Sequence, residues 1–282
     1  MIVYLVPNTT KPLALSVTKQ AIKLLQQAGA NAILDCSVQD FCKASGIQYL
    51  SAEDAFCECD AVITIGGDGT LLHTAKQCLK FNKPILGINL GRTGFLATCE
   101  IDEMEYKLSK LAHKEFQYDN RSLLTAIVNE NFTAAKTALN DVVIYKGSRL
   151  QTIDFNIYCD EILVNRCSGD GVIIATPTGS TAYSLSAGGP ILDTHIQGIV
   201  VSMICAHSLN QPAMVFAADR KIRIEVNSNQ RNDIFISTDG EEEQRLSDGA
   251  SVQIELLKQS INLITFNPAD QFDAIDKKLR GR

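Results

Sequence analysis

The stretch that decides the fold is Ala-Val-Ile-Thr-Ile-Gly-Gly-Asp-Gly-Thr-Leu-Leu-His-Thr-Ala-Lys-Gln-Cys-Leu, residues 61–79. Its first five residues are apolar or β-branched and predict a strand over 61–65, and the apolar spacing that follows predicts a helix over 71–79. Glycines between the two allow a sharp turn and the close approach of a ligand. The amino end of the helix offers N–H groups and partial positive charge that suit a phosphate.

Asp68 places a negative charge in this turn. A carboxylate beside phosphates is unfavourable unless it serves a purpose, such as holding Mg²⁺ or accepting a proton from a hydroxyl nucleophile. It could equally cap the helix in a purely structural turn. The pattern is neither a Walker A loop nor the three-glycine dinucleotide fingerprint, so the turn alone leaves these interpretations open.

The residues around this stretch alternate between strand and helix patterns up to about residue 115. Short apolar runs predict strands over 2–6, 32–34 and 84–88, and helical spacing predicts helices over 13–28 and 103–113. Gly29 follows the first of these helices as a terminating glycine. Strands that alternate with helices predict an α/β layered structure with parallel pairing.

The pattern changes near Phe116, where short β-rich runs follow one another without long helices between them. Many of these runs alternate apolar and polar residues, which is typical of a half-buried antiparallel sheet. A final helix is predicted over Asp270–Leu279, after Pro268. The second half of the chain is therefore expected to be a β-rich domain, with a boundary near residues 114–121. The runs are 123–128, 141–144, 154–158, 162–164, 172–175, 199–204, 221–226, 234–237 and 252–256.

Composition narrows the function classes. The 282 residues carry a net charge of −6, and a general nucleic-acid binder would usually show a basic surplus. No segment has 18 uninterrupted apolar residues, so we expect no membrane span. Nine scattered cysteines predict free thiols and a reducing, cytoplasmic compartment. Cys36, Cys42, Cys78 and Cys205 have apolar neighbours and are expected to be buried.

A second candidate segment is rich in hydroxyl groups. Gly169-Asp170-Gly171 precedes the run 172–175, and seven of the fifteen residues in Thr176–Pro190 carry a hydroxyl, whereas none is charged. Neutral hydrogen bonds of this kind suit a base or a ribose, although a tight structural turn has the same composition. Asn140-Asp141 lies just before another strand, where an asparagine can read an adenine edge or simply begin the strand.

Taken together, these segments resemble the NAD kinase family, close to its bacterial branch. The turn Gly66–Thr70 is similar to the family's kinase motif, which diacylglycerol, sphingosine and phosphofructo-kinases share. Gly169–Pro190 is similar over its whole length to the family's most specific signature. Asn140-Asp141 and the segment Asn89–Leu96 also look like family segments, and the order and spacing match over most of the chain.

This resemblance implies a fold and an activity. The fold would be an α/β, Rossmann-like domain over 1–118, joined by the returning segment 267–282, and a β-sandwich-like domain over 119–266. The activity would transfer a phosphoryl group from ATP or polyphosphate, with Mg²⁺ or another divalent metal, to the adenosine ribose 2′-hydroxyl of NAD. The protein would be a cytoplasmic homotetramer with no membrane or nucleic-acid partner.

The resemblance also implies roles for individual residues. Asp68 would accept the hydroxyl proton, with Gly67 and Gly69 beside it, and His73 would lie near the dinucleotide. Asn140 would contact adenine, and Asp141 would contact a ribose hydroxyl. Asp170 would approach the nicotinamide end from a neighbouring subunit. The adenosine pocket would be lined by Thr181, Ala182, Tyr183, Ser184, Leu185 and Ser186.

The sequence departs from the family pattern at three places. Asp141 is one methylene shorter than the more usual glutamate. Cys167-Ser168 stands where many bacterial members carry a basic residue, and Glu241 replaces a residue that is commonly neutral or basic. Two alternatives to an NAD kinase stay open at this point. They are a lipid kinase that shares the Gly-Gly-Asp-Gly turn and a non-catalytic dinucleotide sensor.

Overall fold

The computed structural model describes residues 1–91, 94–147, 151–208, 210–228, 233–241, 243–267, 269 and 272–276. The chain divides into two compact units, one formed by Met1–Asn120 with Ile261–Arg282 and the other by Arg121–Ser260. The sequence placed the corresponding divisions at 118/119 and 266/267. Two strands, β6 (Gln117–Val128) and β17 (Ser251–Thr265), each run from one unit into the other.

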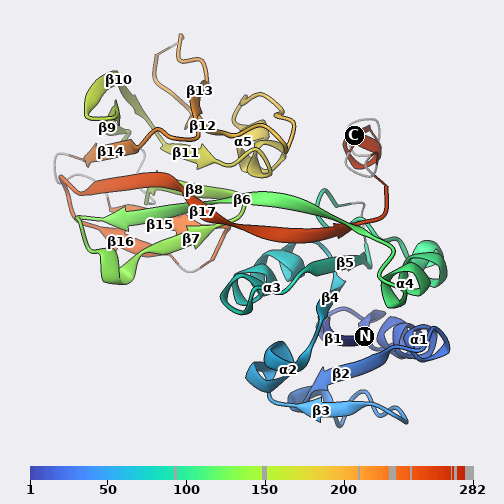
Figure 1. Cartoon of the computed structure of the whole chain (residues 1–282). Coiled ribbons are helices and arrows are strands. Elements are labelled where there is room, and N and C mark those ends of the chain that lie inside the picture. Colours follow the sequence, from blue (N-terminus) through green and yellow to red (C-terminus); the bar gives the residue numbers. More distant parts are fainter. Residues whose placement is uncertain are drawn as a thin grey trace. The chain divides into compact units, whose positions relative to one another are not determined.

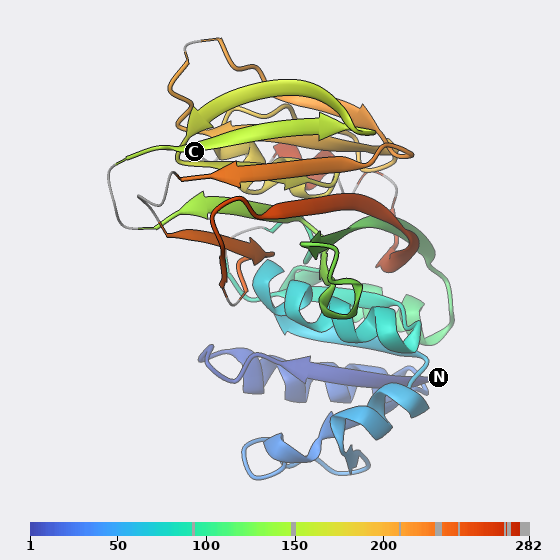
Figure 2. The ribbon, with the colours of Figure 1, turned by 90° about the vertical axis from the view of Figure 1, so that its left-hand side faces the viewer.

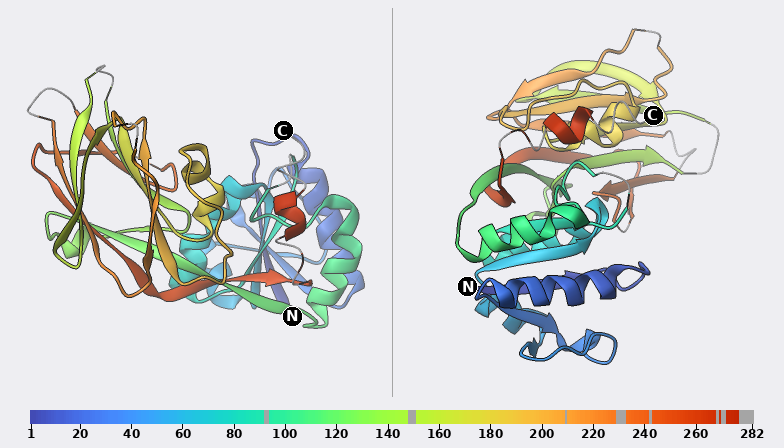
Figure 3. Two further views of the ribbon diagram at one scale, coloured as in Figure 1. Left: turned by 90° about the horizontal axis from the view of Figure 1, so that it is seen from above. Right: turned by 90° about the vertical axis from the view of Figure 1, so that its right-hand side faces the viewer.

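The first unit is built on a parallel sheet with helices on both faces (Figure 1). The strand order is β17–β5–β4–β1–β2–β3, so the order reverses between β1 and β4. Helices α1 and α4 pack together on one face, and α2 and α3 cover the other (Figure 3). The strands and helices of this unit are β1 (Ile2–Pro7), α1 (Ala14–Gln27), β2 (Asn31–Asp35), η1 (Cys36–Val38), β3 (Gln48–Leu50), α2 (Ala52–Glu58), β4 (Ala61–Gly66), α3 (Asp68–Phe81), β5 (Ile85–Asn89), η2 (Ile101–Glu103) and α4 (Met104–Ala112).

Apolar periodicity explains most of these elements. All residues of β4 and β5 are buried, as expected for central parallel strands covered on both faces. Helix α1 buries one stripe that includes Val17, Ala21 and Leu25. The sequence did not predict β3 or α2. Strand β3 has three residues, and α2 buries only Ala55 and Phe56, which is too little for a periodic pattern.

The second unit consists of two antiparallel sheets (Figure 2). One has the order β10–β9–β14–β17, with β6 and β7 attached, and the other has the order β13–β12–β11–β8–β15–β16. Phe155, Val172 and Ile224 belong to a single apolar core to which strands of both sheets contribute, which makes the unit a sandwich. Its remaining elements are η3 (Phe132–Ala134), β7 (Lys136–Ala138), β8 (Asp141–Lys146), β9 (Ile153–Cys159), β10 (Ile162–Gly169), β11 (Gly171–Ala175), η4 (Gly179–Thr181), α5 (Tyr183–Ser186), β12 (Gly198–Ile204), β13 (Met214–Ala217), β14 (Ile222–Asn227), β15 (Ile234–Thr238) and β16 (Gln244–Leu246).

The predicted fold class, an α/β domain with a β-rich sandwich-like domain, is confirmed. The short strands β7, β13 and β16 were not predicted, because three or four residues are too few to show alternation. Residues 272–276 are helical, within the helix predicted over Asp270–Leu279. Pro268 and the other residues of that prediction lie outside the described residues.

Two of the four cysteines expected to be buried are not. Cys42 and Cys78 are buried, but Cys36 begins a 3₁₀ turn and Cys205 follows β12, and both are exposed. The apolar sequence neighbours of Cys36 and Cys205 therefore did not predict that these two residues, which follow the ends of strands, are exposed. All nine cysteines are free thiols. Within the described residues, no helix is long and apolar enough to span a bilayer.

Candidate active site

Asp68 is the first residue of α3, directly after the glycine turn at the carboxyl end of β4. Its side chain does not cap its own helix, because Gly67 occupies the N-cap position. The carboxylate instead accepts three backbone N–H groups of another segment. Oδ2 accepts from Phe95 at 2.8 Å, and Oδ1 accepts from Leu96 at 3.1 Å and Ala97 at 3.0 Å. The helix-capping interpretation of Asp68 is therefore wrong.

Glycines make room for this carboxylate. A Cβ atom on Gly94 would lie 2.0 Å from Asp68 Oδ1, and a Cβ on Gly66 would lie 2.2 Å from Thr70 Oγ1. Real Cβ atoms do not approach other atoms this closely, so both positions require glycine. The space around Gly69 is open, since a Cβ there would meet no atom within 4 Å. The turn is thus packed on the side that faces residues 94–97 and open at Gly69.

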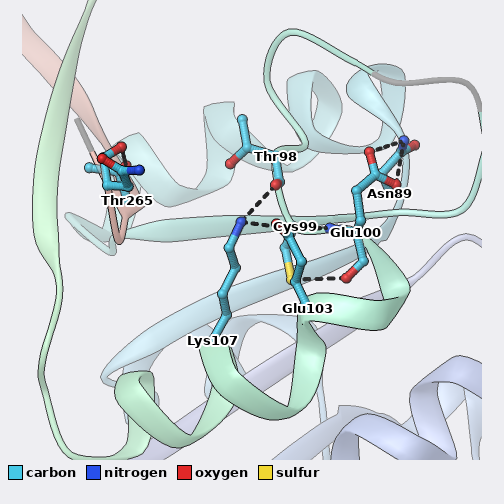
Figure 4. Close-up of polar contacts among 8 residues, drawn as sticks. Asn89, Thr98, Cys99, Glu100, Glu103, Lys107 and Thr265 are labelled. Atoms are coloured by element: carbon cyan, nitrogen blue, oxygen red, sulfur yellow. Dashed lines mark hydrogen bonds and ion pairs between the residues drawn. The ribbon is translucent and has the colours of Figure 1, made fainter. Parts of the chain in front are cut away.

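Further polar contacts hold the residues that directly follow this segment (Figure 4). Lys107 of α4 is buried and donates to the Thr98 carbonyl at 2.9 Å and to Glu103 Oε2 at 2.8 Å. Asn89, at the end of β5, donates to the Glu100 carboxylate at 3.2 Å. One ion pair and these hydrogen bonds hold the residues that directly follow 95–97, and they therefore limit how far this segment, and with it Asp68, can move.

In the second unit, Asn140 and Asp141 are held by an aspartate that follows β15. Asp239 accepts the N–H groups of Leu139 at 2.9 Å, Asn140 at 2.7 Å and Asp141 at 3.2 Å. The backbone of Asp239 has a φ of 54°, in the left-handed region that aspartate tolerates better than most residues. The start of β8 is thus fixed by a residue about 100 positions later in the chain.

Asp141 is buried beside Asp239, with 5% of its surface exposed. Burial and the neighbouring carboxylate of Asp239 raise the pKa of Asp141 to about 7, and a hydrogen bond from the Tyr183 N–H opposes the rise. A raised pKa near neutrality is typical of carboxyl groups in functional sites, although structural carboxyl pairs also show it. Near neutral pH this carboxyl group is therefore present in both its protonated and its ionised form.

The hydroxyl-rich segment packs against the same strand. Thr176 donates its N–H to the Asn140 carbonyl at 2.9 Å and its Oγ1–H to the Leu139 carbonyl at 2.6 Å. A Cβ on Gly179 would lie 1.9 Å from the Asn140 carbonyl oxygen, so this contact requires glycine. Several hydroxyls that suggested ligand binding are thus used to build the loop. Ser184 is among them, since its Oγ lies 3.0 Å from Ser202 Oγ and it is fully buried.

A cavity of about 600 Å³ lies in this unit. Asn140, Asp141, Ala182 and Tyr183 line it together with Asp170. The Asp170 carboxylate is paired with Lys146 at 2.7 Å. Further lining residues are Val143, Tyr145, Lys146, Gly147, Ile204, Ser237, Asp239, Gly240, Glu241 and Glu243. The structure therefore brings together five of the residues that the sequence singled out, and it adds Lys146 and Asp239.

The other predicted site residues are placed as follows. His73 lies on the exposed face of α3. Leu185 and Ser186 belong to α5 and Thr181 lies just before it, and none of the three lines the cavity. Ser168 hydrogen bonds to Asp154 rather than facing the cavity. Glu241 does line the cavity. Of the segment Asn89–Leu96, Arg92 and Thr93 lie outside the described residues.

Models of known protein families match both units of the chain. Residues 3–116 match the family model of the ATP-NAD kinase N-terminal domain, and residues 139–266 match that of the ATP-NAD kinase C-terminal domain. The chain belongs to the NAD kinase family. The NAD kinase of Thermoanaerobacter sp. (strain X514) is 35% identical over 280 residues, 98% of each chain. That of Caldanaerobacter subterraneus subsp. tengcongensis is 35% identical over 283 residues, also 98% of each chain.

Solved structures of NAD kinases and an NADH kinase have the same fold. The yeast NADH kinase complexed with NADH superimposes with a TM-score of 0.88 at 26% identity, covering 99% of this chain and 87% of that one. An NAD kinase from Archaeoglobus fulgidus in complex with ATP has a TM-score of 0.77 at 22% identity and covers 98% of each chain. The second likeness supports the fold alone.

The candidate site contains residues that the sequence did not reveal. Gly94, Phe95 and Leu96 were noted only as part of a family segment, and Ala97, whose amide also holds Asp68, was not noted. Asp239 and Lys146 were not predicted as site residues. Lys11, which reaches the glycine turn from the loop after β1, was also missed. A search for polar residues at the carboxyl ends of the parallel strands would have found Lys11.

Proposed function

We propose that this chain transfers the terminal phosphoryl group of ATP to the 2′-hydroxyl of the adenosine ribose of NAD, producing NADP and ADP. The observation that carries the proposal is the fixed carboxylate of Asp68 at the carboxyl end of β4, in a chain that matches both NAD kinase domains. A dinucleotide sensor needs no placed proton acceptor. The family match also disfavours a lipid kinase.

The hydrogen bonds to Asp68 support Oδ2 as the oxygen that would accept the proton. Each carboxylate oxygen has two acceptor positions. Among the described residues, Leu96 and Ala97 occupy both positions of Oδ1, whereas Phe95 alone donates to Oδ2. Oδ2 therefore keeps one position for the ribose hydroxyl. General-base assistance of this kind contributes typically about 10²–10⁴-fold to the rate.

In the proposed step, the ribose 2′-oxygen attacks the γ-phosphorus of ATP. The new O–P bond forms while the bond between the γ-phosphorus and the bridging oxygen breaks, and its electron pair leaves with ADP. The hydroxyl proton passes to Oδ2 of Asp68. Phosphoryl transfer requires mainly positioning and charge neutralisation, which one base and a cationic surrounding can supply.

Residues of both units would contact the dinucleotide, most of them in the second unit. We assign Asn140 to adenine and Asp141 to a ribose hydroxyl, because both line one cavity with Ala182 and Tyr183. The rest of the segment Thr181–Ser186 would shape the adenosine pocket, and Asp170 would approach the nicotinamide end. Gly67, Gly69 and His73 would lie along the dinucleotide near Asp68. An ionised Asp141 accepts a hydrogen bond from a ribose hydroxyl well.

A divalent metal such as Mg²⁺ would enter with ATP. In the described part of the chain, no group of three or more His, Cys, Asp or Glu side chains is arranged to hold a metal ion. Mg²⁺ commonly keeps several waters and binds through substrate phosphates with one or two carboxylates. The residues present therefore fit a metal held mainly by the triphosphate, where it would neutralise phosphate charge.

We further propose that the protein is a cytoplasmic homotetramer. The small-residue segment Ala187-Gly188-Gly189-Pro190, at the end of the hydroxyl-rich stretch, supports self-association because small residues allow two copies to pack closely. Light scattering at assay concentration tests this proposal. A fully active monomer would refute it and would also remove the role of Asp170 across a subunit boundary.

The decisive assay is purified protein with NAD, ATP and Mg²⁺, followed by an enzymatic readout of NADP. Parallel reactions replace NAD with NADH or diacylglycerol and ATP with polyphosphate. We expect NADP from the wild type and almost none from Asp68→Asn. Phosphorylated lipid, or NAD binding without NADP formation, would replace this proposal with one of the two alternatives.

A further inference from the structure

The loop after β1 is anchored to the glycine turn after β4. The Asn8 N–H donates to the Ile65 carbonyl at 2.9 Å, and Asn8 Nδ2 donates to Thr70 Oγ1 at 3.1 Å. Lys11 Nζ donates to the Gly66 carbonyl at 2.8 Å. Three hydrogen bonds therefore fix the position of this loop, and of the Lys11 ammonium group, against the turn that carries Asp68.

Gly67 leaves room for the ammonium group, whereas at Gly91 a side chain would make only an ordinary van der Waals contact with it. A Cβ on Gly67 would lie 3.1 Å from Lys11 Nζ, and a Cβ on Gly91 would lie 3.7 Å from it. Within the described residues Lys11 forms no ion pair, and its one hydrogen bond goes to a neutral carbonyl. An ammonium group has three N–H donors, so two remain for another acceptor.

The topology places Lys11 where α/β sheets bind ligands. The strand order reverses between β1 and β4, and the loops after these two strands leave the same edge of the sheet. In open α/β sheets, ligands bind in the crevice outside the carboxyl ends of the strands at such a reversal. Lys11 comes from the loop on one side of this reversal and Asp68 from the turn on the other.

We propose that Lys11 is a catalytic residue that binds the phosphates of the phosphoryl donor; the inference rests on the kinase activity proposed above. A triphosphate beside the Asp68 carboxylate concentrates negative charge, and this charge must be neutralised in the transition state. Lys11 donates its remaining N–H groups to non-bridging phosphate oxygens. Its contact with Gly66 keeps the ammonium group in place before the donor arrives.

The test uses two substitutions of Lys11 and a matched control. Lys11→Met removes the charge and the donor, whereas Lys11→Gln removes the charge but can still donate to the Gly66 carbonyl. Lys83 provides the control, because its Nζ also donates to backbone carbonyls, those of Cys57 and Cys59, at the amino ends of β4 and β5. Lys83→Met therefore breaks the same kind of bond at the opposite edge of the sheet.

Calorimetric titration of each full-length variant with ATP–Mg²⁺, inorganic tripolyphosphate and NAD separates phosphate binding from activity. We expect both Lys11 variants to weaken ATP and tripolyphosphate binding and to lower kcat/KM for ATP by about 100-fold, as for the loss of one placed donor. NAD affinity should stay unchanged, and Lys83→Met should bind all three like the wild type.

Other results would overturn the proposal. Near-normal ATP binding and kcat/KM in Lys11→Gln would show that Lys11 only tethers the loop. The same conclusion follows if ATP and NAD affinities fall equally, or if Lys83→Met has the same effect. The titrations with ATP and tripolyphosphate do not require NADP formation. A failure of the proposed NAD kinase activity would therefore be distinguishable from a failure of the role of Lys11.

Discussion

Asp141→Asn should make the ligand-free protein more stable, and the gain should grow as the pH rises. Asparagine keeps the shape of the side chain, and its carbonyl oxygen can still accept the Tyr183 N–H that Asp141 accepts. The substitution removes the ionisation of a buried carboxyl group beside Asp239. The difference in stability between this variant and the wild type therefore measures the free energy that it costs to ionise Asp141 in the folded protein.

The pKa of Asp141 is raised from 3.8 to about 7 in the folded protein. The folded state therefore holds a proton that the unfolded chain has already released between about pH 4 and pH 7. The contribution of protonated Asp141 to the free energy of unfolding is fully present below pH 4 and is lost as the pH rises toward 7. Above pH 7 this group no longer changes the free energy of unfolding with pH. A shift of about three units corresponds to on the order of 4 kcal/mol.

Differential scanning calorimetry at pH 4, 5, 6, 7 and 8 measures this effect. Asp141→Asn should melt close to the wild type at pH 4 and roughly 8–16 °C higher at pH 7 and above, at about 2–4 °C per kcal/mol for a domain of this size. Asp219→Asn is a suitable control, because its carboxylate is exposed and its removal should matter little at any pH. A gain that is equal at pH 4 and pH 8, or a loss at pH 8, would refute the reasoning.

Three further predictions concern the site directly. Asp68→Asn should lower the rate of NADP formation by about 10²–10⁴-fold while NAD affinity stays normal, and a near-normal rate in the purified variant would contradict its role as proton acceptor. Gly94→Ala should lose activity and melt at a lower temperature, because its Cβ would lie 2.0 Å from Asp68 Oδ1, whereas Gly69→Ala meets nothing within 4 Å and should melt like the wild type. Asp141→Ala should weaken NAD binding by roughly 1–3 kcal/mol in calorimetric titration, and Asp141→Glu should bind NAD normally or more tightly. Unchanged NAD affinity in Asp141→Ala would exclude this residue from the site.

The sequence predicted those parts of the fold that depend on neighbouring residues. Strand β4, the glycine turn and helix α3 follow from an unbroken apolar run, small residues and helical spacing, and the structure has them where they were expected. The elements that were missed, such as β3 and α2, bury too few side chains to leave a pattern. Tertiary contacts, not local preference, hold such elements in place.

The site was predictable in its residues but not in its contacts. Asp68 was recognised as important, yet its hydrogen-bond partners lie 27 to 29 positions away, so a local helix cap was an equally reasonable interpretation. Asp239 and Asn140 are 99 positions apart, and Lys11 and Gly66 are 55 apart. Spacing within a motif carries no information on such pairs, because chain topology brings them together.

The path of β17 has a consequence for how the molecule is made. The last strand of the first unit's sheet belongs to residues near 263, which pair with β5 at Ile85, whereas the rest of that sheet lies before residue 90. During synthesis the apolar edge of β5 therefore stays unpaired until nearly the whole chain has been made. The residues of the second unit form one continuous stretch and can complete their sandwich earlier. We therefore expect that chains stopped shortly before residue 260 leave β5 as an open edge that aggregates.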